Sequence, residues 1–244
     1  SVTDQWSTFA VVGPQSRAVL QKVCDDVDLA NAAFPFMSWR AGTVAGVSAR
    51  IMRISFSGEM SFEVNVPSNA GAHVWQALMD AGKEFDITPY GTETMHVLRA
   101  EKGYIIVGQD TDGSISPYDL GMGGMVSKTK DFLGRRSLTR SDTAREDRKQ
   151  LVGLMTDEAD LVLPEGTQLT EQSEASPPPV PMIGHVTSSY YSPTLKRSIA
   201  MAVVRSGTAR MGQKIHAALV DGRYVAATVC NPVFYDPEGK RLHA

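Results

Sequence analysis

Two glutamates beside a glycine turn are the strongest candidates for chemistry in this sequence. Glu59 follows Ser57-Gly58, Glu63 comes four positions later, and Arg53 and Arg99 supply positive charge. A carboxylate that accepts two parallel hydrogen bonds can hold a heterocycle with adjacent N–H donors, such as a pterin, while an arginine suits a negatively charged group. The alternative is that Glu63 and Arg53 form an ion pair that stabilises a hairpin. The residue types alone favour this alternative, because exposed ion pairs are common and most carry no function.

The hairpin that would carry these residues spans 51–66, where apolar and polar residues alternate. A two-residue loop would place apolar residues opposite polar ones. A three-residue loop over 57–59 pairs Ile54 with Phe62 and Arg53 with Glu63, so that each face stays uniform. We therefore expect Arg53 and Glu63 to lie opposite each other on the polar face.

General catalytic motifs are missing from the rest of the chain. The two cysteines, Cys24 and Cys230, lie far apart, and the five histidines have no metal-ligand spacing. There is no G-x-S-x-G, and the glycines at 121–124 match no phosphate-binding loop. The sequence predicts no metal site and no disulfide framework.

Composition excludes several classes of protein. The 244 residues are 42% hydrophobic and 21% charged, with a net charge of −3, as in ordinary globular proteins. The basic cluster at 135–149 is interrupted by acidic residues, which indicates a solvated linker and no nucleic-acid partner. No apolar run is long enough to span a membrane, and no signal peptide is visible. Together with the unpaired cysteines, this suits a cytoplasmic protein.

The order of predicted elements indicates an α+β region followed by a β-rich one. A strand is expected at 9–12, with helices at 14–24, 68–81, 92–103 and 131–138. Ser68 and Thr92 are the expected N-caps, and Met95, Val97 and Leu98 the expected inner face of the third helix. Short apolar runs separated by turn residues begin at 151 and predict a small barrel or sandwich. We place the domain boundary near residue 148.

Several segments in this order resemble the folate-dependent aminomethyltransferase, or glycine cleavage T-protein, family. Residues 53–64 resemble its R-x-[ST]-[YF]-[TS]-G-E-x-[GS]-[FW]-E signature, and 98–103 its L-R-x-E-x-G element. Further similarities are at 115–121, 130–135, 184–189, 192–195 and 232–235. The resemblance implies a partial aminomethyltransferase-like folate-binding domain over 1–148 and an all-β barrel domain over 149–244.

Within that family, residues 232–243 look most like the C-termini of alpha subunits of heterotetrameric sarcosine oxidases. This resemblance implies a tetrahydrofolate-binding segment of a larger flavoenzyme, with FAD, FMN and NAD bound elsewhere and other sarcosine oxidase subunits as partners. Such an enzyme oxidises sarcosine to give glycine, hydrogen peroxide and 5,10-methylenetetrahydrofolate. Two alternatives remain: a fragment of a glycine-cleavage aminomethyltransferase, and a non-catalytic assembly module of a flavoenzyme complex.

Motif positions then imply roles for individual residues. Glu63 falls where the family binds the pterin ring, with Arg53 as a partner that orients its carboxylate. Phe56, where relatives often have tyrosine, can stack on the ligand. The remaining candidates for substrate binding are Arg99, Glu59, Tyr190 and Tyr235.

Two departures from the family pattern limit what the chain is expected to do. Ser189 stands where the family has glycine, so that loop can differ. The segment that carries the family's general base, an aspartate, has no counterpart in residues 1–49. We therefore expect no catalytic residue here, an incomplete first domain, and an exposed sheet edge or apolar face that favours a homodimer.

Overall fold

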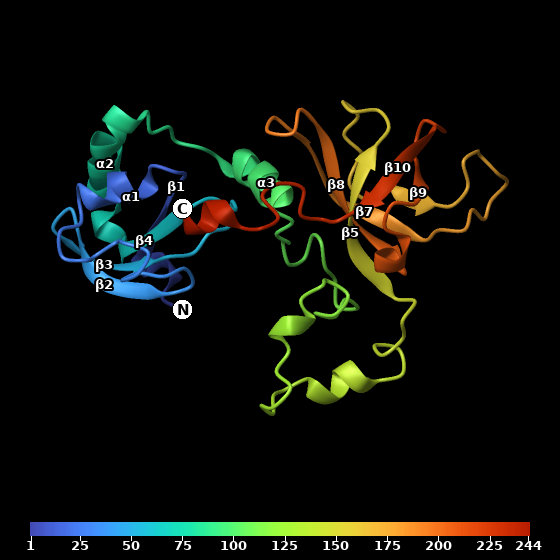
Figure 1. The fold of residues 1–244 in the computed structure, drawn as a ribbon, viewed down its shortest axis with the longest axis horizontal. Helices are drawn as coiled ribbons and strands as arrows, with labels where there is room; N and C mark the ends of the chain where they lie inside the picture. Colours follow the sequence, from blue (N-terminus) through green and yellow to red (C-terminus); the bar gives the residue numbers. More distant parts are fainter. The chain divides into compact units, whose positions relative to one another are not determined.

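The computed structural model describes all residues, 1–244, and forms two compact units (Figure 1). Unit 1 contains Ser1–His96 together with Glu238–Ala244, and unit 2 contains Val97–Pro237. The division falls inside α3 (Thr92–Glu101). No helix is both long enough and apolar enough to cross a lipid bilayer.

Unit 1 is built on a four-stranded antiparallel sheet with the order β1-β4-β3-β2. Its strands are β1 (Trp6–Val12), β2 (Trp39–Val44), β3 (Val47–Met52) and β4 (Ser61–Pro67). Phe62, Val64 and Val66 are fully buried and form one core with residues of α1 (Ser16–Gln21) and α2 (Gly71–Gly82). Because strand residues alternate between faces, Glu63 and Asn65 point to the opposite, open face.

The predicted hairpin register is wrong by one residue. The structure pairs Met52 with Glu63 and Ile51 with Val64, so Arg53 does not lie opposite Glu63. The strands end at Met52 and Ser61, and residues 53–60 form a longer connection than the three-residue loop expected. The predicted register was wrong because it assumed that Arg53 and Ile54 belong to a strand, whereas both lie outside the sheet.

The helices of unit 1 differ from the prediction mainly at their ends. α1 is shorter than 14–24, and α2 starts after a 3₁₀ turn, η2 (Ser68–Ala70), so that Ala70 and not Ser68 is its N-cap. Short 3₁₀ helices also occur at η1 (Thr3–Gln5), η3 (Lys83–Phe85) and η7 (Lys240–His243).

The inner face predicted for α3 is also wrong. Its buried residues are Arg99, Ala100 and Glu101, while Met95, Val97 and Leu98 are only partly buried. Hydrogen bonds from other segments of unit 2 satisfy the charged side chains, so tertiary contacts override the hydrophobic pattern.

Unit 2 contains a closed six-stranded barrel with the order β10-β5-β8-β7-β6-β9, which confirms the predicted barrel. Its strands are β5 (Lys149–Thr156), β6 (Gln168–Thr170), β7 (Gly184–Ser192), β8 (Arg197–Arg205), β9 (Lys214–Ala218) and β10 (Tyr224–Cys230). Val152, Leu154 and Val204 are among the fully buried residues of its core. The short helices of this unit are η4 (Gly123–Met125), η5 (Arg135–Thr139) and η6 (Gly207–Arg210).

Residues 97–148 belong to the same compact unit as the barrel, a different division from the boundary predicted near 148. The hydrogen bond from Leu151 N of β5 to the Asp119 carbonyl at 2.8 Å helps to join them, and within 97–148 the Asp119 carboxylate pairs with Arg148 at 2.9 Å. Burial alone would raise the pKa of Asp119. The hydrogen bonds from Arg148 and Ser116 together have the larger effect, so the pKa of Asp119 lies below its usual value. Domains 1–148 and 149–244 remain a prediction from the sequence.

Candidate functional site

Glu63 lies in the middle of the open face of the unit 1 sheet. Ala10 is its partner on β1 and Met52 its partner on β3, and Met52 in turn pairs with Trp39 on β2. Directly opposed residues of antiparallel strands point to the same face. The single carboxylate is therefore flanked across the sheet by alanine, methionine and an exposed tryptophan.

The carboxylate of Glu63 is half-buried, and burial raises its pKa. No hydrogen bond or ion pair joins it to another side chain of the described chain. Burial, with the charge of Glu63 as a second cause, also raises the pKa of Tyr90, which places the Tyr90 hydroxyl within electrostatic reach. The sequence analysis missed Tyr90, because Pro89-Tyr90-Gly91 has only the character of a connecting turn.

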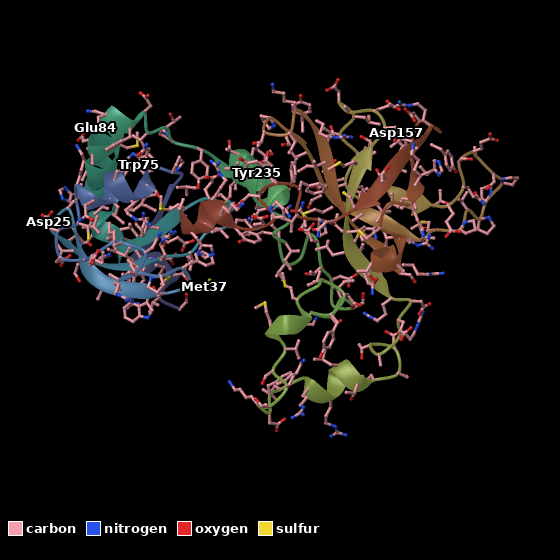
Figure 2. The ribbon with its side chains drawn as sticks, in the orientation of Figure 1. Asp25, Met37, Trp75, Glu84, Asp157 and Tyr235 are labelled. Carbon is pink, nitrogen blue, oxygen red and sulfur yellow. The ribbon has the colours of Figure 1, made fainter.

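A cavity of about 490 Å³ runs along the edge strand β1, next to this position. Ala10 and Tyr90 both line it, and Ala10 is the cross-strand neighbour of Glu63. Its walls are mainly apolar, and Figure 2 labels one of the contributing residues, Trp75 of α2. The Trp75 ring lies 6.0 Å from that of Phe9. Phe9 pairs with Val64 and faces the helices, whereas Ala10 shares the face of Glu63, so the cavity follows the free edge of the sheet and adjoins Glu63 only through Ala10.

Glu59 and Phe56 lie in the connection 53–60 and are both partly buried. The carboxylate of Glu59 accepts a hydrogen bond from Arg241 Nε at 2.5 Å. Glu59 therefore already has a cationic partner, unlike Glu63. The difference makes Glu63 the better candidate of the two for binding an external donor.

Arg53 is almost completely buried and does not pair with Glu63, so the expected ion pair is wrong. Its guanidinium donates to the carbonyl oxygens of Ser61 at 3.3 Å and Leu242 at 2.8 Å, and lies 4.9 Å from the Phe62 ring centroid. Burial and the charge of Arg17 lower its pKa. Arg53 holds the start of β4, two residues before Glu63.

Arg99 is fully buried in unit 2, in a polar network that the sequence did not indicate. Its Nη atoms donate to Asp110 at 2.5 Å, Ser188 at 2.7 Å and the Tyr190 hydroxyl at 3.2 Å. Asp110 also accepts from Thr187 at 2.6 Å and Ser188 at 2.7 Å. Within this guanidinium only Nε has no partner, so most of its donors are occupied by the protein itself.

The other candidates in unit 2 also have structural contacts. The ring of Tyr190 lies 5.7 Å from the guanidinium of Arg99, and the backbone N–H of Tyr235 donates to the Glu101 carbonyl at 2.9 Å (Figure 2). Ser189 uses its hydroxyl to join Leu163 N at 3.1 Å and the Ile199 carbonyl at 3.2 Å, bonds that glycine could not form. Glu63, Phe56 and Glu59 thus belong to unit 1, and Arg99, Tyr190 and Tyr235 to unit 2.

Comparison with known protein families gives two matches. Residues 1–130 match the GCVT N-terminal domain, and residues 149–236 match the glycine cleavage T-protein C-terminal barrel domain. The second match covers all six strands of the barrel described above.

Curated relatives extend the similarity over the whole chain. The chain is 50% identical over 243 residues to the sarcosine oxidase subunit alpha of Corynebacterium sp. (strain U-96). It is 40% identical over 247 residues to the sarcosine oxidase subunit alpha of Rhizobium meliloti (strain 1021). These matches cover 99% and 100% of the chain but only 25% of each relative. An aminomethyltransferase from Thermotoga petrophila is 31% identical over 235 residues, which cover 96% of the chain and 61% of that relative.

A solved structure has the same fold. The crystal structure of glycine cleavage system aminomethyltransferase T from Bartonella henselae superimposes with a TM-score of 0.78 at 23% identity. The match covers 95% of this chain and 60% of that one. At this identity the likeness establishes the fold alone.

Proposed function

The chain belongs to the glycine cleavage T-protein family, and from that premise we propose that it binds tetrahydrofolate through the carboxylate of Glu63. The observation that carries the proposal is the half-buried, unpaired state of this carboxylate, whose pKa is raised by burial. A buried anion without partners is costly, and a ligand with N–H donors would relieve that cost. A pterin offers two adjacent donors, which match the two oxygens of one carboxylate.

The neighbouring residues fit a flat, mostly apolar ring. Met52 and Ala10 flank Glu63 on the sheet, and after burial the charge of Glu63 is the second cause of the raised pKa of Tyr90. Phe56 is proposed to stack on the ring from the 53–60 connection. Arg53 fixes the strand that carries Glu63 through its bond to the Ser61 carbonyl.

The roles of Arg99, Tyr190 and Tyr235 rest on the family resemblance. The Nη donors of Arg99 are already bonded inside unit 2, which leaves Nε as its only group for a ligand. These three residues stay candidates from the resemblance alone, all within unit 2, and the binding of the pterin is assigned to Glu63.

We further propose that the chain acts in a longer protein related to sarcosine oxidase alpha subunits. The chain spans about a quarter of the length of those relatives. In such a protein, tetrahydrofolate would capture the one-carbon unit of oxidised sarcosine as 5,10-methylenetetrahydrofolate, while glycine and hydrogen peroxide are the other products. Flavin and nicotinamide cofactors, the other subunits and the catalytic base would come from outside these residues.

The alternative of an aminomethyltransferase fragment has weaker support, since identity to the Thermotoga petrophila protein is 31% against 50% for the Corynebacterium subunit. The assembly-module alternative predicts no folate binding at all, so one binding experiment separates it from the proposal.

The test is a calorimetric titration of the chain with tetrahydrofolate, using wild type and Glu63→Gln. Hydrogen bonds to a charged group contribute about 1.5–3 kcal/mol, so the variant should bind roughly 10- to 100-fold more weakly. Glu93→Gln is the matched control, because the Glu93 side chain is 91% exposed, and it should bind like wild type. Equal binding by wild type and Glu63→Gln would refute the assignment.

A further inference from the structure

Residues 241–244 contact the connection 53–60, which precedes Glu63. Leu242 is buried to 6% exposure, and its carbonyl oxygen accepts the 2.8 Å hydrogen bond from Arg53. Arg241 donates to the carboxylate of Glu59 at 2.5 Å. Both ends of the 53–60 connection are therefore linked to this short segment, although it lies far away in the sequence.

The other side of the 241–244 segment is fixed to the body of unit 1. Arg17 donates to the Ala244 carbonyl at 3.0 Å, and Asn31 donates to the His243 carbonyl at 2.9 Å. The His243 ring packs edge-on against Phe36, with ring centroids 5.5 Å apart. The segment thus joins the 53–60 connection to α1 and to the residues that follow it.

The 53–60 connection has few polar contacts to the rest of unit 1 at its centre. Gly58 N and Glu59 N are bonded only to the serine hydroxyls of Ser55, at 3.1 Å, and Ser57, at 3.3 Å. Arg53 has a buried Nε without a partner, so its remaining bonds, including the one to Leu242, are needed to offset the burial of its charge.

From these contacts we infer that residues 241–244 are a positioning segment for the proposed folate site: they hold the 53–60 connection, and with it Phe56 and the start of β4, in the arrangement that binds the ligand. Glu59 then acts by pairing with Arg241 and not by touching the ligand. This inference rests on the proposed function, since it assigns a role to the segment next to the same site.

The test uses charge reversal across the Arg241–Glu59 pair in the full chain. Arg241→Glu places two like charges together and should loosen the connection. If the binding arrangement is then populated about one-tenth of the time, affinity for tetrahydrofolate falls about tenfold. The double variant Glu59→Arg with Arg241→Glu restores an ion pair and should bind within about threefold of wild type, as should the conservative variant Arg241→Lys.

Hydrogen exchange of residues 53–60 gives a second readout that needs no ligand. Arg241→Glu should speed exchange there and the double variant should restore protection, whereas Glu63→Gln should leave exchange unchanged and weaken binding roughly 10- to 100-fold. Lys240→Ala is the control, because the Lys240 side chain is 77% exposed and lies outside the segment.

Two results would overturn the inference. The first is an Arg241→Glu variant whose tetrahydrofolate affinity and hydrogen exchange equal those of wild type. The second is a double variant that binds tetrahydrofolate as weakly as Arg241→Glu, which would make Glu59 a ligand contact. Failure of the proposed function is a separate result. In that case wild type binds no tetrahydrofolate, while the exchange data still report whether the segment holds the connection.

Discussion

At the scale of single residues, Glu63 is the least satisfied charged group of the unit 1 sheet. Its pKa is raised by burial, so the folded state holds a proton more tightly than the unfolded chain does. Protonated Glu63 therefore stabilises the folded state at any pH below its pKa in the unfolded chain. This contribution is lost as the pH rises through the higher pKa of the folded state, so ionised Glu63 destabilises the fold at neutral pH. Such a cost is typical of binding and catalytic sites.

Arg99 and Asp110 are the opposite case, since their charges are paired with each other within the protein. Both side chains are completely buried, 2.5 Å apart. Removing one partner leaves an uncompensated buried charge, which costs about 3–5 kcal/mol. Asp110→Ala should lower the free energy of unfolding of unit 2 by about that amount in guanidinium denaturation.

The control for this prediction is Asp131→Ala. The Asp131 side chain is 94% exposed and faces Arg135 at 4.0 Å, so its removal should change stability by less than about 0.5 kcal/mol. A loss below about 1 kcal/mol for Asp110→Ala would show that the network contributes little to the fold.

At the scale of elements, sequence patterns predicted which segments form strands and helices better than how they pair. The hairpin containing Glu63 was expected, but its register depended on where the strands end. Residues 53–60 lie outside the strands and are held by backbone hydrogen bonds at Arg53 and Met60, by the Arg53 side chain and by the 241–244 segment. Similarly, α3 was expected, but not the burial of its arginine and glutamate. Contacts between segments distant in the sequence decide both features.

The end of α3 depends on a glycine for a specific reason. Gly103 has φ +74°, and a Cβ there would lie 2.7 Å from the Pro232 carbonyl oxygen. Gly103→Ala combines left-handed strain with this close contact and should cost about 1–3 kcal/mol. Thermal unfolding measures the effect.

Gly113→Ala is the matched control for that substitution. Gly113 has no heavy atom within 4 Å of an added Cβ and no left-handed φ, so the change should stay within about 0.5 kcal/mol. Equal melting temperatures for the two variants would contradict the role given to Gly103.

At the scale of the whole molecule, the α+β region and the barrel could be predicted because alternation and turn residues mark strands locally. The grouping of residues 97–148 with the barrel could not, because it depends on contacts with the barrel strands that no local pattern indicates, such as Arg99 with Ser188 and Asp119 with Leu151. Tyr90 was missed for the same reason. The homodimer expected from the open sheet remains a prediction, with β1 and β2 as the edge strands.

The central claim, that the Glu63 carboxylate binds the pterin, is tested most directly by measuring its own titration. Carbon-13 NMR of the Glu63 carboxyl, assigned with Glu63→Gln, follows ionisation with and without tetrahydrofolate. Without ligand, the pKa should lie above the usual glutamate value of about 4.3. N–H donors of a bound pterin favour the charged form, so saturating tetrahydrofolate should lower this pKa, and affinity should rise as pH increases through the ligand-free value. A Glu63 titration that is identical with and without bound tetrahydrofolate would contradict the claim.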